Sequence, residues 1–210
     1  MAKKVMIFDF DGTLADTLPL LVNILNRLSG KYGYKTIEES DLNTLRGKTS
    51  KEILKSLGIS LLKLPFVVRN VRQELRREIE FIRPIAGIRT MLFQLKKRGH
   101  KLGIVTSNSE ENVKKFLEAN NLQYFDFVCS GSSIFGKAGL LKSLMKSQHL
   151  KPGEAVYVGD ETRDIDAARK ARVKIISVSW GFNSRQILEK EKPDFLIDAP
   201  GELTKIVESL

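Results

Sequence analysis

Six short apolar segments alternate with helical patterns along most of the chain, and this alternation constrains the fold more than any other feature. The segments are rich in Val, Ile and Phe and almost continuously apolar, as strands buried on both faces are. They are KKVMIFD, HKLGIVTS, FDFVCS, EAVYVGD, VKIISVSW and PDFLID. Helices are predicted between most of them, at roughly 85–98, 109–120, 137–148, 163–171 and 184–191. The pattern predicts an α/β fold in which helices cover both faces of a parallel sheet.

The segment from residue 15 to about residue 83 departs from this alternation. It contains no convincing strand, and four helices are predicted in it, at roughly 17–32, 38–44, 49–57 and 64–81. Pro84 and Gly87 then mark the return to the alternating pattern. We therefore predict a core made of residues 1–14 and 84–210, and an all-helical domain of residues 15–83 inserted after the first strand. We call residues 15–83 the helical insert.

Composition narrows the class of protein. The 210-residue chain is 42% hydrophobic and 29% charged, so it can bury one sizeable core and carry a smaller insert. Its single cysteine, Cys129, excludes an internal disulfide framework and fits a reducing compartment. Asp9 stops the first apolar run too soon for a signal-peptide core, and no later run approaches the roughly 20 residues that span a bilayer. We expect a cytoplasmic protein without a membrane partner.

The charge of the chain favours anionic partners. There are 35 Lys and Arg residues against 25 Asp and Glu residues, a formal net charge of +10. The basic residues are mixed with acidic ones, as in RQELRREIE, and no aromatic residues alternate with Arg and Lys as a nucleic-acid stacking surface would need. Most of the charge is therefore interpreted as solvated surface. We expect a small phosphorylated metabolite as partner and no nucleic acid.

Two aspartates follow the first predicted strand in the stretch FDFDGTLADT. Asp9 and Asp11 lie at its carboxyl end, and ligands of open α/β sheets bind in the crevice beyond such strand ends. Gly12 allows a sharp exit of the chain. An isolated DxDG is also typical of a turn whose aspartates bind their own backbone. Three further segments that end at the same edge of the sheet favour the functional interpretation.

Polar residues end two of these segments. Thr106, Ser107 and Asn108 follow the second strand, and we expect the Thr106 hydroxyl to face the aspartates, although Ser107 or Ser109 is also a natural helix N-cap. Lys137 lies in the first turn of a predicted helix, where its charge opposes the helix dipole. This position favours a functional role for Lys137 over a role in helix stability. The alternative is an exposed surface lysine.

The last segment, VGDETRD, adds two more carboxylates. Asp160 ends a strand and Asp164 lies four residues later, so the two side chains can converge across one helical turn. Together with Asp9 and Asp11 they place four carboxylates at one edge of the sheet. Such a group would repel strongly unless a hard cation lay among them, and oxygen ligands suit Mg2+.

The four segments DFDGT, IVTS, Lys137 and GDETRD, in this order, resemble the motifs of the haloacid dehalogenase-like superfamily of hydrolases. The resemblance covers the whole chain and implies a Rossmann-like, doubly wound core. The helical insert behind DFDGTLADT, together with SVSWGFNS near the C-terminus, looks most like the phosphoglycolate-phosphatase-like branch. The resemblance then implies that the helical insert is a mobile cap over the active site.

The resemblance implies roles for the catalytic residues. Asp9 would attack the phosphorus of a phosphomonoester to give an aspartyl-phosphate. Asp11 would protonate the leaving oxygen and later take a proton from water. Thr106 would donate a hydrogen bond to the phosphoryl oxygens, and Lys137 would offset their charge. Many relatives have a proline-containing stretch after the motif lysine, whereas this chain has GKAGLLK, so Lys142 is an alternative for that role.

Binding roles follow in the same way. Mg2+ would be held by Asp9, by the backbone carbonyl of Asp11 and by Asp160, with Asp164 acting directly or through water. Ser107 and Asn108 are candidate substrate-binding residues. The haloacid dehalogenases themselves lack the second aspartate, so the presence of Asp11 favours phosphate esters over halides.

The helical insert is expected to choose the substrate. It carries 13 Lys and Arg against 8 Asp and Glu, a net charge of +5. Arg46 and Lys48, in the segment LRGKTSKE, lie in a predicted loop and are candidate contacts to an anionic or polar substrate. The alternative is a solvated loop before a helix.

Three functions follow from these observations. The sequence favours a Mg2+-dependent phosphatase of small phosphomonoesters, such as phosphoglycolate-like or sugar phosphates. The first alternative is a phosphomutase on the same scaffold, similar to beta-phosphoglucomutase, in which the aspartyl-phosphate outlives reorientation of the product. The second is a non-enzymatic binding role, on nucleic acid, through the net charge of +10.

Overall fold

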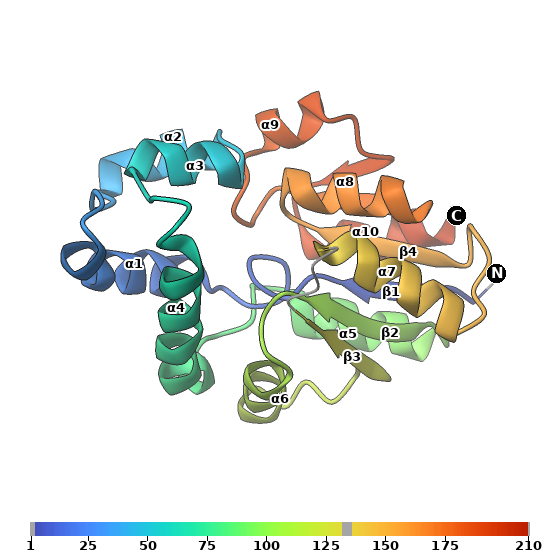
Figure 1. Ribbon diagram of the computed structural model, residues 1–210. Helices are drawn as coiled ribbons and strands as arrows, with labels where there is room; N and C mark the ends of the chain where they lie inside the picture. Colours follow the sequence, from blue (N-terminus) through green and yellow to red (C-terminus); the bar gives the residue numbers. More distant parts are fainter. Residues whose placement is uncertain (1–2, 132–135, 210) are drawn as a thin grey trace.

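The computed structural model describes residues 3–131 and 136–209 and contains one sheet of six parallel strands (Figure 1). The strands lie in the order β3-β2-β1-β4-β5-β6, and every neighbouring pair is parallel. They are β1 (Val5–Phe8), β2 (Lys101–Thr106), β3 (Phe127–Ser130), β4 (Ala155–Gly159), β5 (Lys174–Val178) and β6 (Phe195–Ile197). The predicted parallel sheet is confirmed, with each strand inside its predicted apolar segment.

Strand β1 shows why these segments are apolar throughout. Successive side chains of a strand point to opposite faces of the sheet. Met6 and Phe8 belong to the hydrophobic cluster on one face, and Val5 and Ile7 belong to the cluster on the other. Because helices cover both faces, neither set of side chains can be polar.

Three helices pack on each face of the sheet (Figure 1). One face is covered by α5 (Ile88–Lys97), α6 (Glu110–Ala119) and α10 (Pro200–Glu208). The other is covered by α7 (Gly136–Ser147), α8 (Thr162–Ala171) and α9 (Arg185–Lys190). The sequence prediction did not include α10, although Pro200 in its first turn and Glu202, which accepts hydrogen bonds from the amides of Asp198 and Ala199, are helix-start signals.

The strand order places the crevice of the sheet at β1. The chain moves outward from β1 through β2 to β3, then returns to place β4 on the other side of β1. The reversal between β1 and β4 is the switch point at which ligands of such sheets bind. Asp9 follows β1 and donates its backbone N–H to the carbonyl of Val158 in β4, over 2.8 Å. Asp9 and Asp160 therefore face the same crevice from neighbouring strands.

The helical insert lies beyond the carboxyl ends of the strands (Figure 1). It contains two short 3-10 helices, Glu39–Asp41 and Ile79–Phe81, and no strand among its described residues. Its α-helices are α1 (Leu18–Tyr32), α2 (Leu42–Arg46), α3 (Ser50–Leu57) and α4 (Leu64–Glu78). The four predicted helices are thus present, with the one expected at 38–44 divided into a 3-10 turn and α2. Among the described helices of the whole chain, none is long and apolar enough to cross a membrane.

Two adjacent segments connect the insert to the sheet. Ala15 forms an isolated antiparallel bridge with Pro84. The Asp16 amide donates to the carbonyl of Arg83 over 3.0 Å. The Ile85 amide donates to the carbonyl of Leu14, also over 3.0 Å. The outgoing and returning chains are therefore hydrogen-bonded to each other where they pass between the insert and the sheet.

Candidate active site

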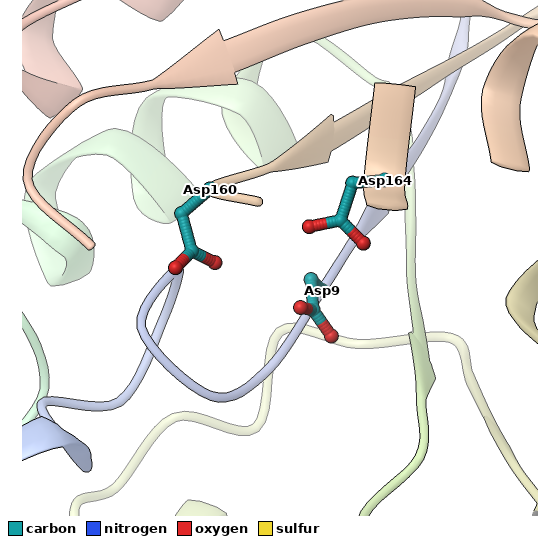
Figure 2. A group of neighbouring side chains, drawn as sticks. All are labelled: Asp9, Asp160 and Asp164. Atoms are coloured by element: carbon teal, nitrogen blue, oxygen red, sulfur yellow. The ribbon is translucent and has the colours of Figure 1, made fainter. Parts of the chain in front are cut away.

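Three buried aspartates meet at the carboxyl ends of β1 and β4 (Figure 2). Asp9, Asp160 and Asp164 each offer one carboxylate oxygen, and these oxygens lie within 4.8 Å of one another. Asp9 is 2% exposed, and the other two are fully buried. The structure thus brings together three of the four carboxylates that the sequence placed at this edge.

The Asp160 carboxylate is held from both sides. The Thr13 hydroxyl donates to Oδ1 over 2.6 Å, and the backbone N–H of Phe182 donates to Oδ2 over 2.7 Å. Gly12, with a φ of 75°, and Gly181 pack directly against this carboxylate, so a Cβ at either position would clash with it. The sharp exit predicted at Gly12 therefore serves a close approach of the backbone to Asp160.

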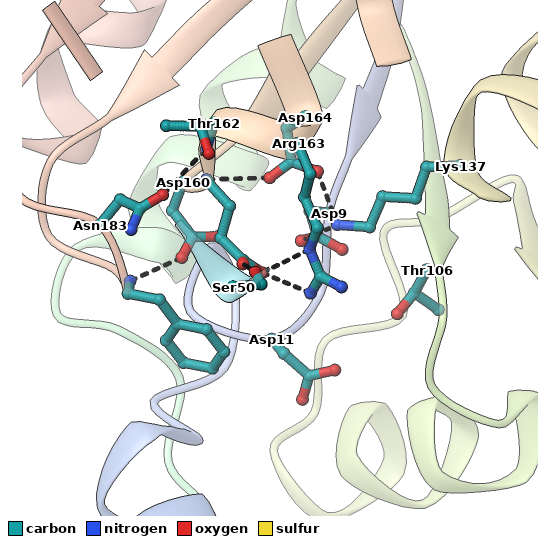
Figure 3. A network of polar contacts seen from close by, with 12 residues as sticks. Asp9, Asp11, Ser50, Thr106, Lys137, Asp160, Thr162, Arg163, Asp164 and Asn183 are labelled. Carbon is teal, nitrogen blue, oxygen red and sulfur yellow. Dashed lines mark hydrogen bonds and ion pairs between the residues drawn. The ribbon is translucent and has the colours of Figure 1, made fainter. Parts of the chain in front are cut away.

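Lys137 bridges the other two aspartates (Figure 3). Its Nζ donates to Asp9 Oδ2 and, over 2.6 Å, to Asp164 Oδ1. Burial lowers the pKa of Lys137, but Asp164 and Asp9 together raise that pKa above its ordinary value, so the side chain is a cation. Lys142, the alternative for this role, is exposed on α7.

The cluster has the properties of a site for a hard divalent cation. Burial raises the pKa of Asp9, an effect that Lys137 opposes and Asp164 reinforces. Burial also raises the pKa of Asp160, and the nearby charge of Asp9 adds to the effect. One lysine offsets only part of three buried negative charges, and a divalent cation among the oxygens would offset the rest. An oxygen-only donor set suits Mg2+.

Asp11 is oriented by a separate contact. Asn108 Nδ2 donates to both of its carboxylate oxygens, over 3.1 and 3.2 Å. The Asn108 amide is fixed in turn, because its Oδ1 accepts from the Ser109 backbone N–H over 2.8 Å and from Asn112 Nδ2 over 2.9 Å. Burial raises the pKa of Asp11, and the hydrogen bond from Asn108 partly lowers it. Figure 3 shows the Asp11 carboxylate apart from the three-aspartate cluster.

Thr106, the last residue of β2, and Ser107, which follows it, have different surroundings. Thr106 is fully buried, and its Oγ1 accepts the backbone N–H of Asn108 over 3.0 Å. Among the described residues no acceptor takes its hydroxyl proton, which can therefore be donated to a ligand. Figure 3 shows Thr106 on the same side of the site as Lys137. The carbonyl of Ser107 accepts from Nη2 of Arg72 in α4, over 3.0 Å, so this turn also contacts the insert.

Arg46 and Lys48 lie at a contact between the insert and the rest of the chain, residues 1–14 and 84–210, which we call the sheet domain. Nη2 of Arg46 donates to the carbonyl of Ser179 over 3.0 Å. The carbonyls of Arg46 and Lys48 both accept from Asn183 Nδ2, over 3.3 and 2.9 Å. Within the described residues, neither side chain makes a hydrogen bond or ion pair with Asp9 or Asp11. The structure therefore places the Arg46 guanidinium on a backbone carbonyl of the core.

Several residues of the site were not singled out from the sequence. Thr13 and Glu161 lie inside the motifs DFDGT and GDETRD, which is the signal that could have identified them. Arg163 is a cation in the first turn of α8, an unfavourable position of the same kind as that of Lys137. Ser50, at the start of α3, donates to Glu161 Oε2 over 2.8 Å. No sequence signal connects that pair, because 111 residues separate the two side chains.

A cavity of about 270 Å³ opens beside Asp11, between the insert and the sheet domain. Aliphatic side chains of the insert, such as Leu54 and Val71, form most of its wall. Its charged residues are Asp11, Arg72 and Arg163. The cavity therefore offers a mainly apolar space with two cations next to a carboxyl group.

Comparison with known proteins gives consistent matches. A family model described as haloacid dehalogenase-like hydrolase matches residues 6–178. The chain is 36% identical over 208 residues to a phosphoglycolate phosphatase of Synechococcus elongatus, covering 99% of this chain and 98% of that protein. It is 27% identical over 212 residues to the pyrophosphatase PpaX of Bacillus mycoides, covering 99% and 98%. The solved structure of a predicted phosphatase from Clostridium acetobutylicum superposes over the full length of both chains with a TM-score of 0.85 at 22% identity.

Proposed function

Because the chain belongs to the haloacid dehalogenase-like hydrolase family, we propose that it is a Mg2+-dependent phosphatase of small phosphomonoesters. The observation that carries the proposal is the buried cluster of Asp9, Asp160 and Asp164, bridged by Lys137 and adjacent to Asp11. The relative that is 36% identical to this chain supports phosphoglycolate or a similar small ester as substrate. Sugar phosphates are the next class.

Asp9 is the proposed nucleophile. Its carboxylate oxygen attacks the phosphorus, the bond from phosphorus to the ester oxygen breaks, and an aspartyl-phosphate forms on Asp9. Asp11 gives its proton to the departing ester oxygen, which leaves as an alcohol. Burial raises the pKa of Asp11, which favours the protonated form that this step needs.

Water completes the reaction. It attacks the phosphorus of the aspartyl-phosphate while Asp11, now a carboxylate, takes a proton from it. The bond from phosphorus to Asp9 breaks, which releases inorganic phosphate and restores both side chains. Asn108 holds the Asp11 carboxylate in one orientation for both steps. The Thr106 hydroxyl donates a hydrogen bond to the phosphoryl oxygens, and Lys137 offsets their charge.

Asp9, Asp160 and Asp164 would hold Mg2+, with the backbone carbonyl of Asp11 as a further ligand. When bound, the ion offsets the charge of the phosphoryl oxygens in a site already lined with carboxylates. Thr13 and the Phe182 backbone N–H fix the Asp160 carboxylate that would bind it. Ser107 remains a proposed substrate contact.

The proposal includes a cap domain formed by residues 15–83, which would cover the substrate. The hydrogen-bonded connections at Ala15 and Pro84 support these limits. The cavity beside Asp11, with walls contributed by the insert, supports the covering role. A covered site excludes water and strengthens each electrostatic contact to the phosphoryl group.

Release of inorganic phosphate tests the function. The panel contains phosphoglycolate, sugar phosphates, nucleoside monophosphates and an aryl phosphate, each with Mg2+ and with EDTA, for wild type and Asp9→Asn. We expect Mg2+-dependent release that Asp9→Asn abolishes. Asp166→Asn is the matched control, because that carboxylate is exposed on α8 and pairs with Lys170. Conversion of a sugar phosphate to its isomer without phosphate release would replace the phosphatase by the phosphomutase.

A further inference from the structure

Arg163 is the second cation of the site, and the proposed reaction does not use it. It lies in the first turn of α8, where the helix dipole disfavours a positive charge. Its side chain is 48% exposed, although it stands beside the buried Asp160 and Asp164. A cation kept at the mouth of a carboxylate cluster, against the helix dipole, indicates a role outside helix stability.

Glu161 fixes the direction of the Arg163 side chain. Nε of Arg163 donates to Glu161 Oε1 over 2.8 Å, and Nη2 donates to the same oxygen. The Glu161 side chain is only 7% exposed. Within the described residues these are the hydrogen bonds of the guanidinium, so Nη1 stays available to a ligand. In the view of Figure 3 the Arg163 side chain extends from α8 past Asp9, with its guanidinium on the side of Asp11.

The insert holds Glu161 in turn. Ser50, the first residue of α3, donates its hydroxyl to the second oxygen, Glu161 Oε2, over 2.8 Å. One oxygen of Glu161 thus binds the helical insert and the other binds Arg163. Packing of the insert on the sheet domain therefore orients Arg163 through Glu161.

The guanidinium faces the space that the leaving group must occupy. In the proposed reaction Asp11 protonates the leaving oxygen, so the rest of the leaving group lies in the cavity next to Asp11. Arg163 lines that cavity, and its wall is otherwise mainly aliphatic. A guanidinium suits a carboxylate by geometry, and an apolar surrounding strengthens the contact.

We propose that Arg163 is a specificity-determining residue that binds an anionic group of the leaving group, and that Glu161 and Ser50 are its positioning residues. The proposal rests on the phosphatase function. It concerns the alcohol part of the ester, whereas Lys137 and Thr106 act on the phosphoryl part.

Two esters of matched size test the role of Arg163. Phosphoglycolate and ethyl phosphate have leaving groups of two carbons, and only the first carries a carboxylate. We expect Arg163→Gln to lower kcat/KM for phosphoglycolate about 30-fold, the value of a lost charge-assisted hydrogen bond, and to lower that for ethyl phosphate far less. Arg163→Lys should restore part of the loss. Arg169→Gln is the control, because Arg169 lies on the same helix with a side chain that is 49% exposed.

The outcomes separate this proposal from the phosphatase function. Equal losses on both esters would overturn it, because Arg163 would then act on the phosphoryl group or on the fold. Wild-type protein that hydrolyses neither these esters nor any other of the panel would overturn the phosphatase function, and the role of Arg163 with it. Wild-type protein that hydrolyses both, with the selective loss in Arg163→Gln, establishes the role.

A double-mutant cycle tests the positioning residues. Ser50→Ala and Glu161→Gln should each raise KM for phosphoglycolate, by about threefold and tenfold, and should add nothing in the Arg163→Gln background. Ser56→Ala is the control on the same helix, since in the described part of the chain its hydroxyl bonds only the carbonyl of Ile53. The Mg2+ concentration for half-maximal activity should stay unchanged. Additive losses in the double variants would overturn the positioning role.

Discussion

The strand ends and the helical insert contribute to the same cavity by different means. At the strand ends, buried side chains such as Asp9 and Asp160 point at one another from the rigid sheet. Arginine side chains of the insert contact the sheet domain by donating hydrogen bonds to its backbone carbonyls. Arg46 donates to the carbonyl of Ser179, and Arg72 donates to that of Ser107. The sheet fixes the reacting groups, and the insert contributes docking contacts and an apolar wall.

The positive charge of the insert lies mainly on its exposed surface. Among the described residues, only three of its 13 Lys and Arg residues form ion pairs: Arg27 with Glu78 at 2.6 Å, Arg77 with Glu74 at 2.8 Å, and Arg76 with Glu111 of α6 at 2.7 Å. Exposed pairs of this kind contribute little stability. Ten of the 13 basic residues of the insert are exposed, which fits the solvated-surface interpretation of the net charge.

Asp160→Asn gives the largest expected effect and tests the strand-end side of the comparison. Activity should fall about 10³-fold, because one of the proposed Mg2+ ligands loses its charge. The folded protein should nevertheless gain stability in EDTA, because burial raises the pKa of Asp160 and the neutral amide removes that cost. The amide can keep both contacts, since its oxygen accepts from the Phe182 N–H and its NH2 donates to Thr13.

Thermal melting with and without Mg2+ measures this. Wild type should gain Tm on addition of Mg2+, as expected of a ligand that binds only the folded state, and Asp160→Asn should not. Asp166→Asn, which changes an exposed carboxylate of α8, should behave as wild type. Equal Mg2+ stabilisation of wild type and Asp160→Asn would show that the cluster is not the cation site.

Asn108→Ala should have the second largest effect. It removes both hydrogen bonds to Asp11 and leaves the carboxyl group without its fixed orientation. We expect kcat/KM to fall about 10- to 100-fold on an alkyl phosphate and less on an aryl phosphate, whose leaving group needs less protonation. In the Asp11→Asn background the same change should cost nothing further. An equal loss on both esters would contradict a role through the proton donor.

Much of the fold and the central part of the site could be predicted from the sequence. Continuous apolar segments identified all six strands, because burial on both faces excludes polar residues from them. The carboxyl ends of parallel strands meet at one edge, so the order of segments already brought Asp9 and Asp160 together. Lys137 was predicted because its charge opposes a helix dipole, and the structure places it between two aspartates.

The rest depends on contacts that local sequence does not encode. The same dipole argument applies to Arg163, but in GDETRD the neighbouring aspartates are the stronger signal. The pairing of Ser50 with Glu161 exists only after the insert folds onto the sheet domain. Arg46 was predicted as a substrate contact from its charge. The sequence did not indicate the contact of its guanidinium with the carbonyl of Ser179, because any residue type can provide a backbone carbonyl.

Arg46→Ala tests, through the free energy of unfolding, whether Arg46 docks the insert on the sheet domain. Loss of the hydrogen bond from a charged, half-buried group should lower the free energy of unfolding by about 1 to 2 kcal/mol. Any loss of activity should be similar for phosphoglycolate and an aryl phosphate, because the contact docks the insert and binds neither leaving group. Urea unfolding and the two KM values measure this, with Arg69→Ala, an exposed arginine of α4, as control. A KM increase confined to phosphoglycolate would contradict this expectation and support Arg46 as a substrate contact.

Lys48→Ala gives the smallest expected effect and asks whether this loop of the insert touches substrate at all. Its backbone contact to Asn183 survives the substitution, because Asn183 binds the carbonyl of residue 48. Stability should therefore change little, and any effect must come from the lost ammonium group. We expect KM for phosphoglycolate to rise about threefold while KM for an aryl phosphate stays constant, because a partly exposed charge in water contributes less than 1 kcal/mol. The control is Lys51→Ala, which removes an exposed lysine from the first turn of the neighbouring helix α3. Equal changes of KM for both esters would show that Lys48 does not recognise the leaving group. Recognition by the insert would then rest on its apolar wall and Arg72, and Arg163 of the sheet domain would be the charged group that selects the ester.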